Sequence, residues 1–478
     1  MSEGAAKKGF GEKPQPKGER RKFQAIKGTR DLLPPETALW NRVEQTAHGV
    51  FGTFGFGEIR VPIFEPTELF ARSIGAETDV VSKEMYSFRD PPENLFEYVQ
   101  SFLGKFGHEK LANLSEEQGK ELAGEIRERQ EVTLVTLRPE ATASVCRAYI
   151  EHNMNQLPQP VKLYYMGPMF RRERPQKGRH RQFYQIGAEV LGGSDAPAID
   201  AEVIEMVMTF FERLGLEDVQ LQINSIGDKN CRPKYVELLR EELRKVKDQL
   251  GPDTQRRIET NPLRVLDSKV ESEQAIIEGL PRIAQHLCDA CSENYDEVKR
   301  QLALRGIVYS QNFRLVRGLD YYMRTTFEIT AKGLGSQNAV CGGGRYDGLV
   351  GMLGGPPTKG IGFAIGEDRL ILSLQEAGKT PGAQGRDVYI AWMGEKAYAM
   401  AIRAAKNLRS AGFCVELPPA EQKFGKALGQ ADKLGARYAL ILGDNEVESG
   451  EWTLKTLATG EQAKFTEASL LKHLKKNL

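Results

Sequence analysis

The segment from residue 167 to residue 189 carries the side chains best suited to chemistry. Two stretches with strand patterning, at 161–170 and 182–191, flank a loop rich in Arg, Lys, Pro and Gly, which predicts a long β-hairpin. Because side chains alternate between the two faces of a strand, polar and aromatic groups should gather on one side. They are Arg171 and Glu173 on the first strand, and Phe183, Gln185, Gly187 and Glu189 on the second.

A solvated face of an antiparallel sheet is the alternative interpretation of this pattern. A solvated face accepts Lys, Thr and Ser as readily as Arg and Gln, and it gives no reason for the single Gly187 among them. We therefore interpret the hairpin as the wall of a cavity. The pattern alone does not name the substrate.

The hairpin resembles motif 2 of the class II aminoacyl-tRNA synthetases, in the form typical of histidyl-tRNA synthetases. Five further segments resemble motifs of the same family and follow in its order. They are Arg60-Val-Pro62 with the helix before it (motif 1), Thr136-Leu-Arg-Pro-Glu-Ala-Thr142 (the amino-acid-binding strand), Leu315-Val-Arg-Gly-Leu-Asp-Tyr-Tyr322 and Gly342-Gly-Gly-Arg-Tyr-Asp-Gly-Leu349 (the histidine-specific motifs) and Gly366-Glu-Asp-Arg369 (motif 3). The resemblance covers nearly the whole chain from Phe23 onward.

The resemblance implies that L-histidine is joined to tRNA(His) through a histidyl-adenylate, with release of AMP and pyrophosphate. A carboxylate is already a nucleophile, so the first step needs ATP held in line and its phosphate charge neutralised. Arginine suits this task because its planar guanidinium binds phosphate oxygens in pairs. The resemblance makes Arg171 and Arg317 the catalytic pair on the α-phosphate, and Mg²⁺ would accompany the ATP. The implied ATP-binding residues are Arg171, Glu173, Arg179, Phe183 and Arg369.

Recognition of histidine requires partners for both nitrogens of its imidazole ring, because unpaired polar groups penalise a wrong side chain. The resemblance gives these roles to Glu189 and to either Tyr321 or Tyr322. It places Arg317 in the histidine site as well, and it assigns the α-amino group to Glu140, Thr142 and Gln185.

Two local features fit these assignments. Glu140 and Thr142 are two positions apart, which on a strand would put them on one face. The run Gly342, Gly343 and Gly344 would let the backbone approach the substrate closely. A plain tight turn is the alternative for the glycines.

The resemblance also implies macromolecular partners. The acceptor end of the tRNA is expected at Arg174 and Gln176 of the hairpin loop, and the family forms homodimers through motif 1. Pro62 lies inside a predicted strand at 58–64, and proline cannot donate to a sheet ladder. This strand is therefore expected at an edge or bent, and edge strands suit pairing with a second subunit.

We predict an α+β fold with several parts. A tail at 1–22 precedes a catalytic domain at 23–227 and 305–380, built on an antiparallel sheet and carrying a helical surface insertion at 90–130. A charge-rich helical insertion domain occupies 228–304, and a strand pattern follows at 314–316. Beyond the Gly/Pro/Thr linker at 378–385, strand patterns at 388–392, 414–417 and 438–442 alternate with helical patterns and predict an α/β domain at 386–478. The resemblance implies that this domain binds the anticodon.

Composition places limits on partners and location. The chain has 478 residues, of which 40% are hydrophobic and 27% charged, as expected of a globular protein. Its net charge is only +1, so contact with RNA must use local basic patches. No apolar run approaches the roughly 18 residues of a membrane span. The tail lacks the apolar core of a secretory signal, and we expect a cytoplasmic protein.

Six cysteines are scattered along the chain and are expected to be free thiols in a reducing compartment. Cys288-Asp-Ala-Cys291 has the spacing of half a zinc site. A structural zinc needs four ligands, and the sequence offers neither a second such pair nor a His-x-x-x-His motif nearby. We therefore predict no metal site.

Two other classes of protein are alternative interpretations of this sequence. A non-catalytic paralogue, such as the regulatory subunit of ATP phosphoribosyltransferase, would be expected to lack the terminal domain and several phosphate-binding arginines. This chain has Arg171, Arg317, Arg369 and a full terminal domain. The other rival is an RNA-binding or regulatory module without aminoacylation, which histidine-dependent pyrophosphate exchange would distinguish from the enzyme.

Overall fold

The computed structural model describes residues 23–75, 78, 80–90, 115, 133–331, 338–380 and 385–477. The chain divides into two compact units. Residues up to 378, apart from 33–42, form the first, and residues 33–42 with those from 379 onward form the second. The first unit contains every residue that the sequence assigns to ATP or histidine.

An eight-stranded, mostly antiparallel sheet lies at the centre of the first unit. The strand order is β1-β5-β6-β11-β10-β9-β7-β8, and only the short strands β1 and β8 pair in parallel with their neighbours. β5 and β6 pair along their full length, from Val161↔Leu191 to Phe170↔Gln182, which confirms the predicted hairpin. The bounds are β1 Gly57–Glu58, β5 Val161–Phe170, β6 Gln182–Leu191, β7 Val219–Ser225, β8 Ser310–Gln311, β9 Met323–Ala331, β10 Ala339–Arg345 and β11 Gly360–Gly366.

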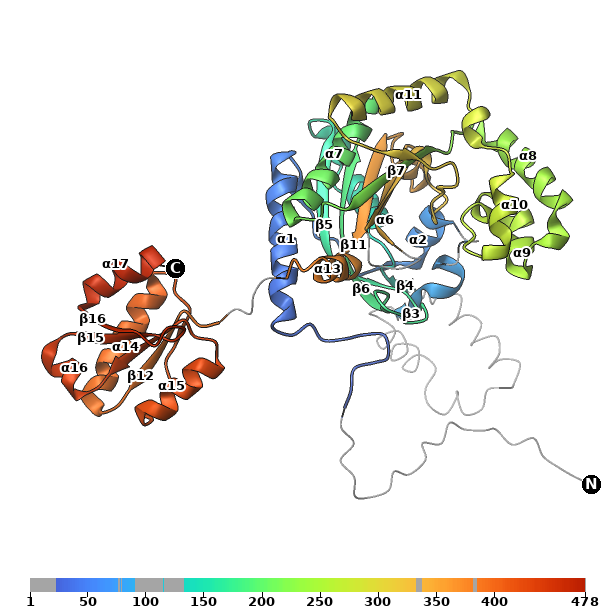
Figure 1. The fold of residues 1–478 in the computed structure, drawn as a ribbon. Helices are drawn as coiled ribbons and strands as arrows, with labels where there is room; N and C mark the ends of the chain where they lie inside the picture. Colours follow the sequence, from blue (N-terminus) through green and yellow to red (C-terminus); the bar gives the residue numbers. More distant parts are fainter. Residues whose placement is uncertain are drawn as a thin grey trace, which may run out of the picture. The chain divides into compact units, whose positions relative to one another are not determined.

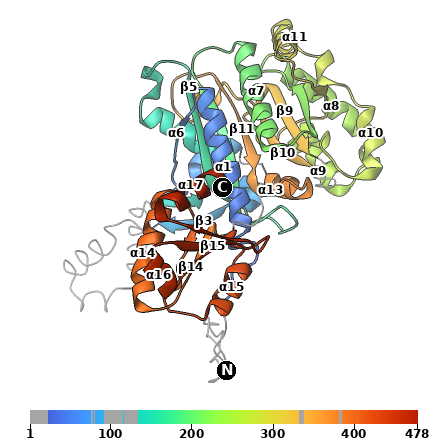
Figure 2. The same cartoon turned by 60° about the vertical axis from the view of Figure 1, so that its left-hand side comes forward.

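Two long helices, α1 (Glu36–Thr53) and α7 (Pro197–Leu214), cover one face of this sheet (Figures 1 and 2). Phe51 of α1 is fully buried there. Its ring centroid lies 5.6 Å from that of Phe210 on α7, 5.5 Å from Tyr164 on β5 and 5.9 Å from Phe363 on β11. Because neighbouring side chains on a strand face opposite ways, the residues on either side of Phe363 and Tyr164 point to the other face.

A three-stranded sheet and two helices accompany the main sheet. The small sheet has the order β2-β4-β3, with β2 Phe64–Pro66, β3 Tyr86–Asp90 and β4 Thr133–Leu137, and the helices are α2 (Thr67–Ile74) and α6 (Thr142–Glu151). Arg138 follows β4 and joins the two sheets. Its Nε–H donates to the carbonyl of Pro168 at 2.9 Å, and its other guanidinium nitrogen donates to the carbonyl of Val61 at 2.7 Å.

The motif 1 segment is not the continuous strand predicted at 58–64. It is extended and paired only in β1 and β2, with unpaired residues around Pro62 between them. The expectation of an edge position or a bend is confirmed, because β1 stands at one end of the main sheet and β2 at one end of the small sheet. Proline removes a donor from the ladder, and the chain changes sheets where the ladder is interrupted.

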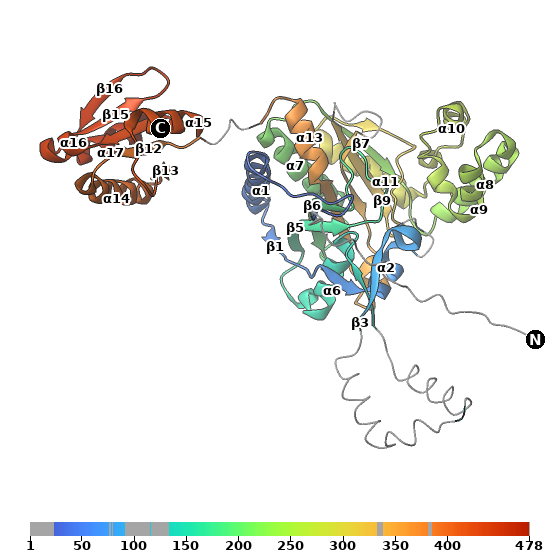
Figure 3. The same cartoon turned by 90° about the horizontal axis from the view of Figure 1, so that it is seen from below.

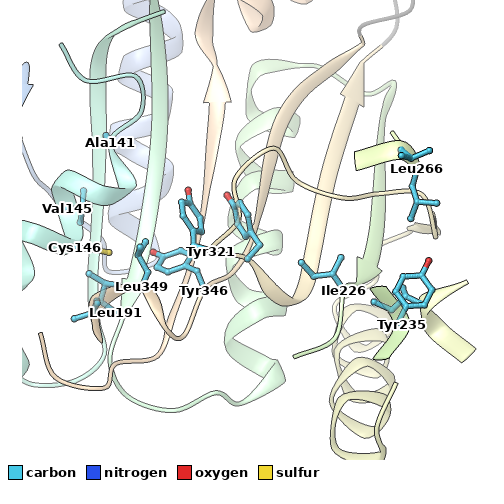
Figure 4. Packing of buried hydrophobic residues seen from close by; sticks show 14 of the residues in the cluster. Ala141, Val145, Cys146, Leu191, Ile226, Tyr235, Leu266, Tyr321, Tyr346 and Leu349 are labelled. Atoms are coloured by element: carbon cyan, nitrogen blue, oxygen red, sulfur yellow. The ribbon is translucent and has the colours of Figure 1, made fainter. Parts of the chain in front are cut away.

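Residues 228–304 are helical, as predicted. They form α8 (Arg232–Lys245), α9 (Pro252–Thr260), α10 (Gln274–Glu278), α11 (Asp289–Leu304) and short 3-10 turns. α8, α9 and α10 lie together at one end of the unit, whereas α11 returns to pack on α7 (Figures 1 and 3). One buried cluster runs from Ala141 beside α6, through Tyr321 and Tyr346, to Ile226 and Tyr235 at the helical segment (Figure 4).

The second unit is a five-stranded sheet with the order β13-β12-β14-β15-β16. Alanines and leucines of α14 (Glu395–Ser410) and α17 (Glu467–Asn477) pack on one face, and the alanines of α15 (Phe424–Lys433) pack on the other. The alternation of strands and helices predicted between 388 and 442 is confirmed, and the sequence interpretation missed the last two strands. The remaining bounds are β12 Val388–Trp392, β13 Val415–Glu416, β14 Tyr438–Leu442, α16 Asp444–Ser449, β15 Trp452–Thr456 and β16 Gln462–Phe465.

Five further expectations concern single segments, the cysteines and the membrane. A strand predicted at 314–316 is wrong, because these residues form turns and irregular backbone. The tail at 1–22 and nearly all of the predicted insertion at 90–130 lie outside the described residues. All six cysteines are free thiols, as expected. Within the described ranges, no helix combines the length and the hydropathy needed to cross a membrane.

Candidate active site

A cavity of about 470 Å³ lies on the sheet face that α1 and α7 leave uncovered. Its lining includes Ala364 and Gly366 of β11, the neighbours of Phe363, which points the other way. All residues that the sequence assigns to ATP or histidine line this cavity except Glu189. They are Glu140, Thr142, Arg171, Glu173, Arg179, Phe183, Gln185, Arg317, Tyr321, Tyr322 and Arg369.

The hairpin loop supplies two arginines held around one carboxylate. Glu173 accepts a hydrogen bond from Arg179 at 3.2 Å and forms a longer ion pair with Arg171 at 3.8 Å. The Nε–H of Arg171 donates to the carbonyl of Pro139 at 2.9 Å, and its guanidinium lies 5.2 Å from the ring centroid of Phe183. β5 ends at Phe170, so Arg171 and Glu173 belong to the loop and the strand-face argument is wrong for these two.

Arg317 reaches the cavity from the segment before β9. Its guanidinium donates to Glu328 at 3.0 Å, and its Nε is buried without a hydrogen-bond partner among the described residues. A β-carbon on Gly342 would stand 2.0 Å from the Arg317 guanidinium, and one on Gly344 would stand 3.0 Å from the Tyr322 ring. The close approaches expected at this glycine run are thus made by side chains of the protein, since only glycine leaves the space.

Arg369 comes from the first turn of α13 (Glu367–Glu376), directly after β11. It donates to the carbonyl of Ala339 at 2.9 Å. The preceding Asp368 ties this helix start to its surroundings, because it accepts from the backbone N–H of Tyr184 at 2.9 Å and from Arg30 at 3.3 Å. These contacts fix the helix start from which Arg369 reaches the cavity.

Glu140 occupies a different kind of backbone from the one expected. It lies in the turn between β4 and α6, so the argument that Glu140 and Thr142 share a strand face is wrong. The carboxylate is buried and accepts from the backbone N–H groups of Thr142 at 2.6 Å and Ala143 at 3.1 Å. Carboxylates are stabilised at helix N-termini, and here one is held at the cavity wall. Burial nevertheless raises the pKa of Glu140 above its ordinary value.

Glu189 lies beneath the cavity and does not line it. It is 1% exposed, and it accepts from the hydroxyl of Thr142 at 2.7 Å and from the hydroxyl of Tyr346. A β-carbon on Gly362 of the next strand would lie 1.7 Å from its carboxylate. Burial raises the pKa of Glu189 to about 8, so in the free protein this group is largely protonated at neutral pH.

Three tyrosine rings surround this acid. The centroid of Tyr321 lies 4.6 Å from that of Tyr322 and 5.7 Å from that of Tyr346. Figure 4 shows Tyr321 and Tyr346 side by side. Tyr321 and Tyr322 both line the cavity, so the choice between them stays open. Burial raises the pKa of Tyr322 to about 12, which keeps its hydroxyl protonated as a donor.

Sequence reasoning missed two contributors to the site. Tyr346 lies inside the second histidine-specific motif, which was the signal that could have drawn attention to it. The segment around Gly28 packs against the hairpin loop, where the carbonyl of Gly28 accepts from the N–H of Arg181 at 2.7 Å. A β-carbon on Gly28 would stand 2.7 Å from the Arg181 side chain. Nothing in the local periodicity indicates this long-range contact.

The two residues expected at the tRNA acceptor end lie away from the cavity. Arg174 and Gln176 are exposed in the hairpin loop, and neither lines the cavity. The backbone of Gln176 exchanges hydrogen bonds with that of Arg179 at 2.9 and 3.1 Å, so the loop closes on itself and presents both side chains to solvent.

The cavity therefore combines guanidinium groups with buried acceptors. Fixed guanidinium groups suit phosphate oxygens, and the buried carboxylate of Glu140 suits an ammonium group. The Oε1 of Gln185 is buried without a hydrogen-bond partner among the described residues. Because buried polar atoms are nearly always paired, this atom points to a donor supplied by a ligand.

Comparison with known proteins places this arrangement in a family. Residues 86–370 match the family model described as histidyl-tRNA synthetase, and residues 387–477 match the model described as anticodon binding domain. The chain is 50% identical over 95% of its length to a histidine--tRNA ligase of Solibacter usitatus, covering 99% of that protein. It is also 50% identical over 94% of its length to a histidine--tRNA ligase of Koribacter versatilis, covering 95% of that protein.

A solved structure agrees with these matches. The crystal structure of apo S. aureus histidyl-tRNA synthetase superposes with a TM-score of 0.73 at 34% identity, covering 95% of this chain and 100% of that one. The α+β fold with an antiparallel catalytic sheet and a separate terminal unit is thereby confirmed. Sequence, geometry and comparison lead to the same conclusion, which is that this chain belongs to the histidyl-tRNA synthetase family.

Proposed function

We propose that this chain activates L-histidine with ATP in the cavity and transfers the histidyl group to tRNA(His), releasing AMP and pyrophosphate. The observation that carries this proposal is that Arg171 and Arg317 line one cavity together with Glu140 and Gln185. Guanidinium groups neutralise the phosphate charge that grows during adenylate formation. The acceptors Glu140 and Gln185 then hold the histidine beside the phosphate.

In the first step, Arg171 and Arg317 are the catalytic residues that contact the α-phosphate. Arg179 contacts the outer phosphates, and Arg369 and Phe183 enclose the adenine between them. Glu173, which pairs with Arg179 at 3.2 Å and more loosely with Arg171 at 3.8 Å, faces the adenine edge. Mg²⁺ enters with the ATP phosphates and is bound mainly by them.

Histidine is held through both of its ends. Glu140, Thr142 and Gln185 receive the α-amino group, and Arg317 receives the carboxylate. Glu189 and one of Tyr321 and Tyr322 pair with the imidazole nitrogens. For that pairing Glu189 gives up one of its present hydrogen bonds, to Thr142 or to Tyr346, and the ring N–H replaces it.

The second step brings in the tRNA. Arg174 and Gln176, exposed in the hairpin loop, contact the acceptor end. The domain at 386–478 binds the anticodon. The catalytic domain, residues 23–227 and 305–380, supplies the catalytic residues. The helical insertion domain at 228–304 lies next to this domain.

The proposed enzyme is a homodimer that pairs through the motif 1 region. Four large apolar side chains of the small sheet and its approach are exposed: Ile63 (44%), Phe64 (54%), Phe88 (47%) and Leu134 (46%). The rings of Phe64 and Phe88 lie 6.5 Å apart, so these two side chains form one patch. A contiguous exposed apolar patch marks an interaction surface, and a second copy of the chain is its proposed partner.

The dimer is tested by light scattering on the purified protein. We expect the mass of two chains for the wild type and of one chain for Phe64→Asp, because a charge buried in an apolar interface without a partner is strongly unfavourable. Val308→Asp is the matched control, since Val308 is exposed elsewhere at 86%. A wild-type mass of one chain at micromolar concentration contradicts the dimer.

The function itself is tested by two assays on the same protein. Histidine-dependent exchange of pyrophosphate into ATP reports the first step, and charging of tRNA(His) with labelled histidine reports both steps. We expect activity in both. Arg174→Ala should lower charging by about tenfold while leaving exchange unchanged, because its side chain lies outside the cavity and one charged contact contributes about 1.5–3 kcal/mol.

The absence of exchange from a folded wild-type protein would refute the enzyme and favour the regulatory paralogue. Exchange without charging would instead restrict the proposal to histidine activation. Exchange stimulated equally by other amino acids would refute the proposed imidazole pocket.

A further inference from the structure

Four side chains outside the active site converge where the main sheet passes into the helical segment. They are Asp228, Cys231, Cys288 and Cys291, and their ligand-type atoms all lie within 4.8 Å of one another. Cys231 Sγ is 3.7 Å from Asp228 Oδ1, and Cys288 Sγ is 4.0 Å from the same oxygen. Two segments about 60 residues apart in sequence thus each contribute a pair of ligand-type groups spaced by two residues.

We infer that these four residues form a structural zinc site. Zinc is bound tetrahedrally by thiolate sulfur at about 2.3 Å and carboxylate oxygen at about 2.0–2.2 Å, so its ligand atoms stand roughly 3.3–3.8 Å apart. The spacings in this cluster, all within 4.8 Å, need to contract by roughly 1–1.5 Å at most. Three thiolates favour zinc over the hard cations calcium and magnesium, and four protein ligands leave no open position for catalysis.

The surroundings suit a cluster of negative ligands. Cys231 and Cys288 immediately precede α8 and α11, and helix N-termini stabilise thiolates. The backbone N–H of Asp228 lies 3.4 Å from Cys231 Sγ, and a guanidinium nitrogen of Arg324 lies 3.8 Å from the second carboxylate oxygen of Asp228. Cys231, Cys291 and Asp228 are at most 5% exposed, which shields the cluster from solvent.

The position of the cluster indicates what the metal does. Asp228 follows β7 through Gly227, whose φ of +64° lets the chain turn beside the Cys231 thiol. Cys231 and Cys288 begin the first and last helices of the segment, so one ion would tie both of its ends to the sheet. The Arg324 N–H donates to the carbonyl of Gly227 at 2.7 Å, and Arg232 donates to the carbonyl of Tyr322 at 2.6 Å. The metal would therefore hold the helical segment against the strand that follows the cavity tyrosines.

This inference replaces the expectation that the chain has no metal site. That expectation required a second Cys-x-x-Cys pair or a histidine pair. The second pair of ligands is in Asp228-Lys-Asn-Cys231, where the carboxylate of Asp228 takes the place of the first cysteine thiol.

The test is the metal content of the full-length protein, purified without chelators and without a metal-affinity tag. We expect about one zinc per chain. Cys231→Ser and Cys288→Ser should each bind zinc more than about 100-fold more weakly, because even residues that only orient a ligand change affinity by 10–100-fold. Cys414→Ser, at an exposed thiol in the second unit, and Cys146→Ala, at a buried thiol outside the cluster, should keep their zinc.

A second measurement covers variants that fail to fold. Wild-type protein stripped by a chelator is titrated with Co²⁺, which absorbs visible light strongly in tetrahedral thiolate sites, and its melting temperature should rise on adding Zn²⁺. No zinc and no cobalt spectrum in the wild type, a disulfide within the cluster, or iron in place of zinc would each overturn the inference. So would zinc that survives both cluster substitutions or is also lost from the controls.

Discussion

The neighbours of Arg317 fix its guanidinium in position for the proposed reaction. Its guanidinium occupies space that only Gly342 leaves open, and Glu328 holds one nitrogen at 3.0 Å. The buried Nε keeps an unused donor among the described residues. A preorganised group of this kind stabilises charge without reorganising during the reaction.

Replacement of Arg317 should therefore affect catalysis far more than folding. We expect Arg317→Ala to lower pyrophosphate exchange by roughly 10²–10³-fold with little change in melting temperature. Arg317→Lys should recover only part of the loss, because lysine lacks the planar fork of donors. Arg300→Ala, which removes an exposed arginine on α11, is the control and should exchange normally. Undiminished exchange in Arg317→Ala would remove this residue from the reaction.

Glu189 carries a prediction about pH. Burial raises its folded-state pKa from an ordinary value of 4.5 to about 8. A raised carboxyl pKa makes its contribution to stability fully present below the unfolded value and lost as pH rises through the folded value. Between about pH 4.5 and pH 8 the folded protein should thus lose a few kcal/mol at this site, since each pKa unit is worth about 1.4 kcal/mol.

The measurement is the free energy of unfolding of wild type and Glu189→Gln across this range. The difference between them should shift in favour of the variant as pH rises, because glutamine cannot ionise. Glu151→Gln, at an exposed position on α6, should keep the wild-type slope. Equal slopes in wild type and Glu189→Gln would show that Glu189 titrates normally.

At the scale of elements, strongly periodic segments were predictable. The strands at 161–170, 182–191, 388–392 and 438–442 have the bounds that the sequence predicts, because alternating or continuous apolar residues between turn residues leave little choice. The failures lie where particular side-chain hydrogen bonds or long-range pairing decide the backbone. Glu140 sits in a turn that is defined by its bonds to the start of α6, and β2 pairs with a strand some seventy residues away.

The active-site cavity and the cysteine cluster likewise contain some residues that the sequence identifies and others that only the fold reveals. The resemblance identified eleven residues that line the cavity. The contact of Gly28 with the hairpin loop and that of Tyr346 with Glu189 became visible only in the fold. The sequence interpretation did not identify Asp228 as a possible metal ligand for a related reason. A lone aspartate after a strand is unremarkable in sequence until the fold brings Cys288 within 4.0 Å of it.

One buried ion pair links two elements of the main unit and can be tested. Arg345 at the end of β10 is 1% exposed and pairs with Asp200 of α7, which is fully buried. The Nε–H of Arg345 lies 3.1 Å from one oxygen of Asp200, and another nitrogen lies 2.8 Å from Asp347. We expect Arg345→Met to cost about 3–5 kcal/mol of unfolding free energy, because it leaves a buried carboxylate unpaired.

The double variant provides the contrast. Asp200→Asn with Arg345→Met should be less destabilised than the sum of the single changes, since neither partner then leaves an unpaired charge. Denaturant titration of the three variants measures this. Strict additivity would mean that Asp200 and Arg345 act independently, contrary to their contact.

At the scale of the whole molecule, near-neutral charge constrains how the protein contacts RNA. With 66 basic and 65 acidic residues, attraction to a polyanion depends on local basic groups and not on overall charge; Arg174 is the one proposed here. The proposed site of histidine activation is a cavity in the first unit, whereas the residues proposed to contact the tRNA acceptor end are exposed. The two steps should therefore respond differently to salt, because exposed charges are screened within about 10 Å at 0.1 M and buried ones much less.

We expect the affinity for tRNA(His), measured as the KM in charging, to weaken roughly twentyfold between about 50 and about 200 mM monovalent salt if about three phosphates are contacted. Histidine-dependent pyrophosphate exchange should change less than about threefold, since the arginines proposed to contact ATP line the cavity. The slope of log KM against log salt should decrease by close to one in Arg174→Ala, because one phosphate contact is lost. Parallel losses in both assays would mean that salt acts on the active site or the fold, and an unchanged slope in Arg174→Ala would place the acceptor contact elsewhere.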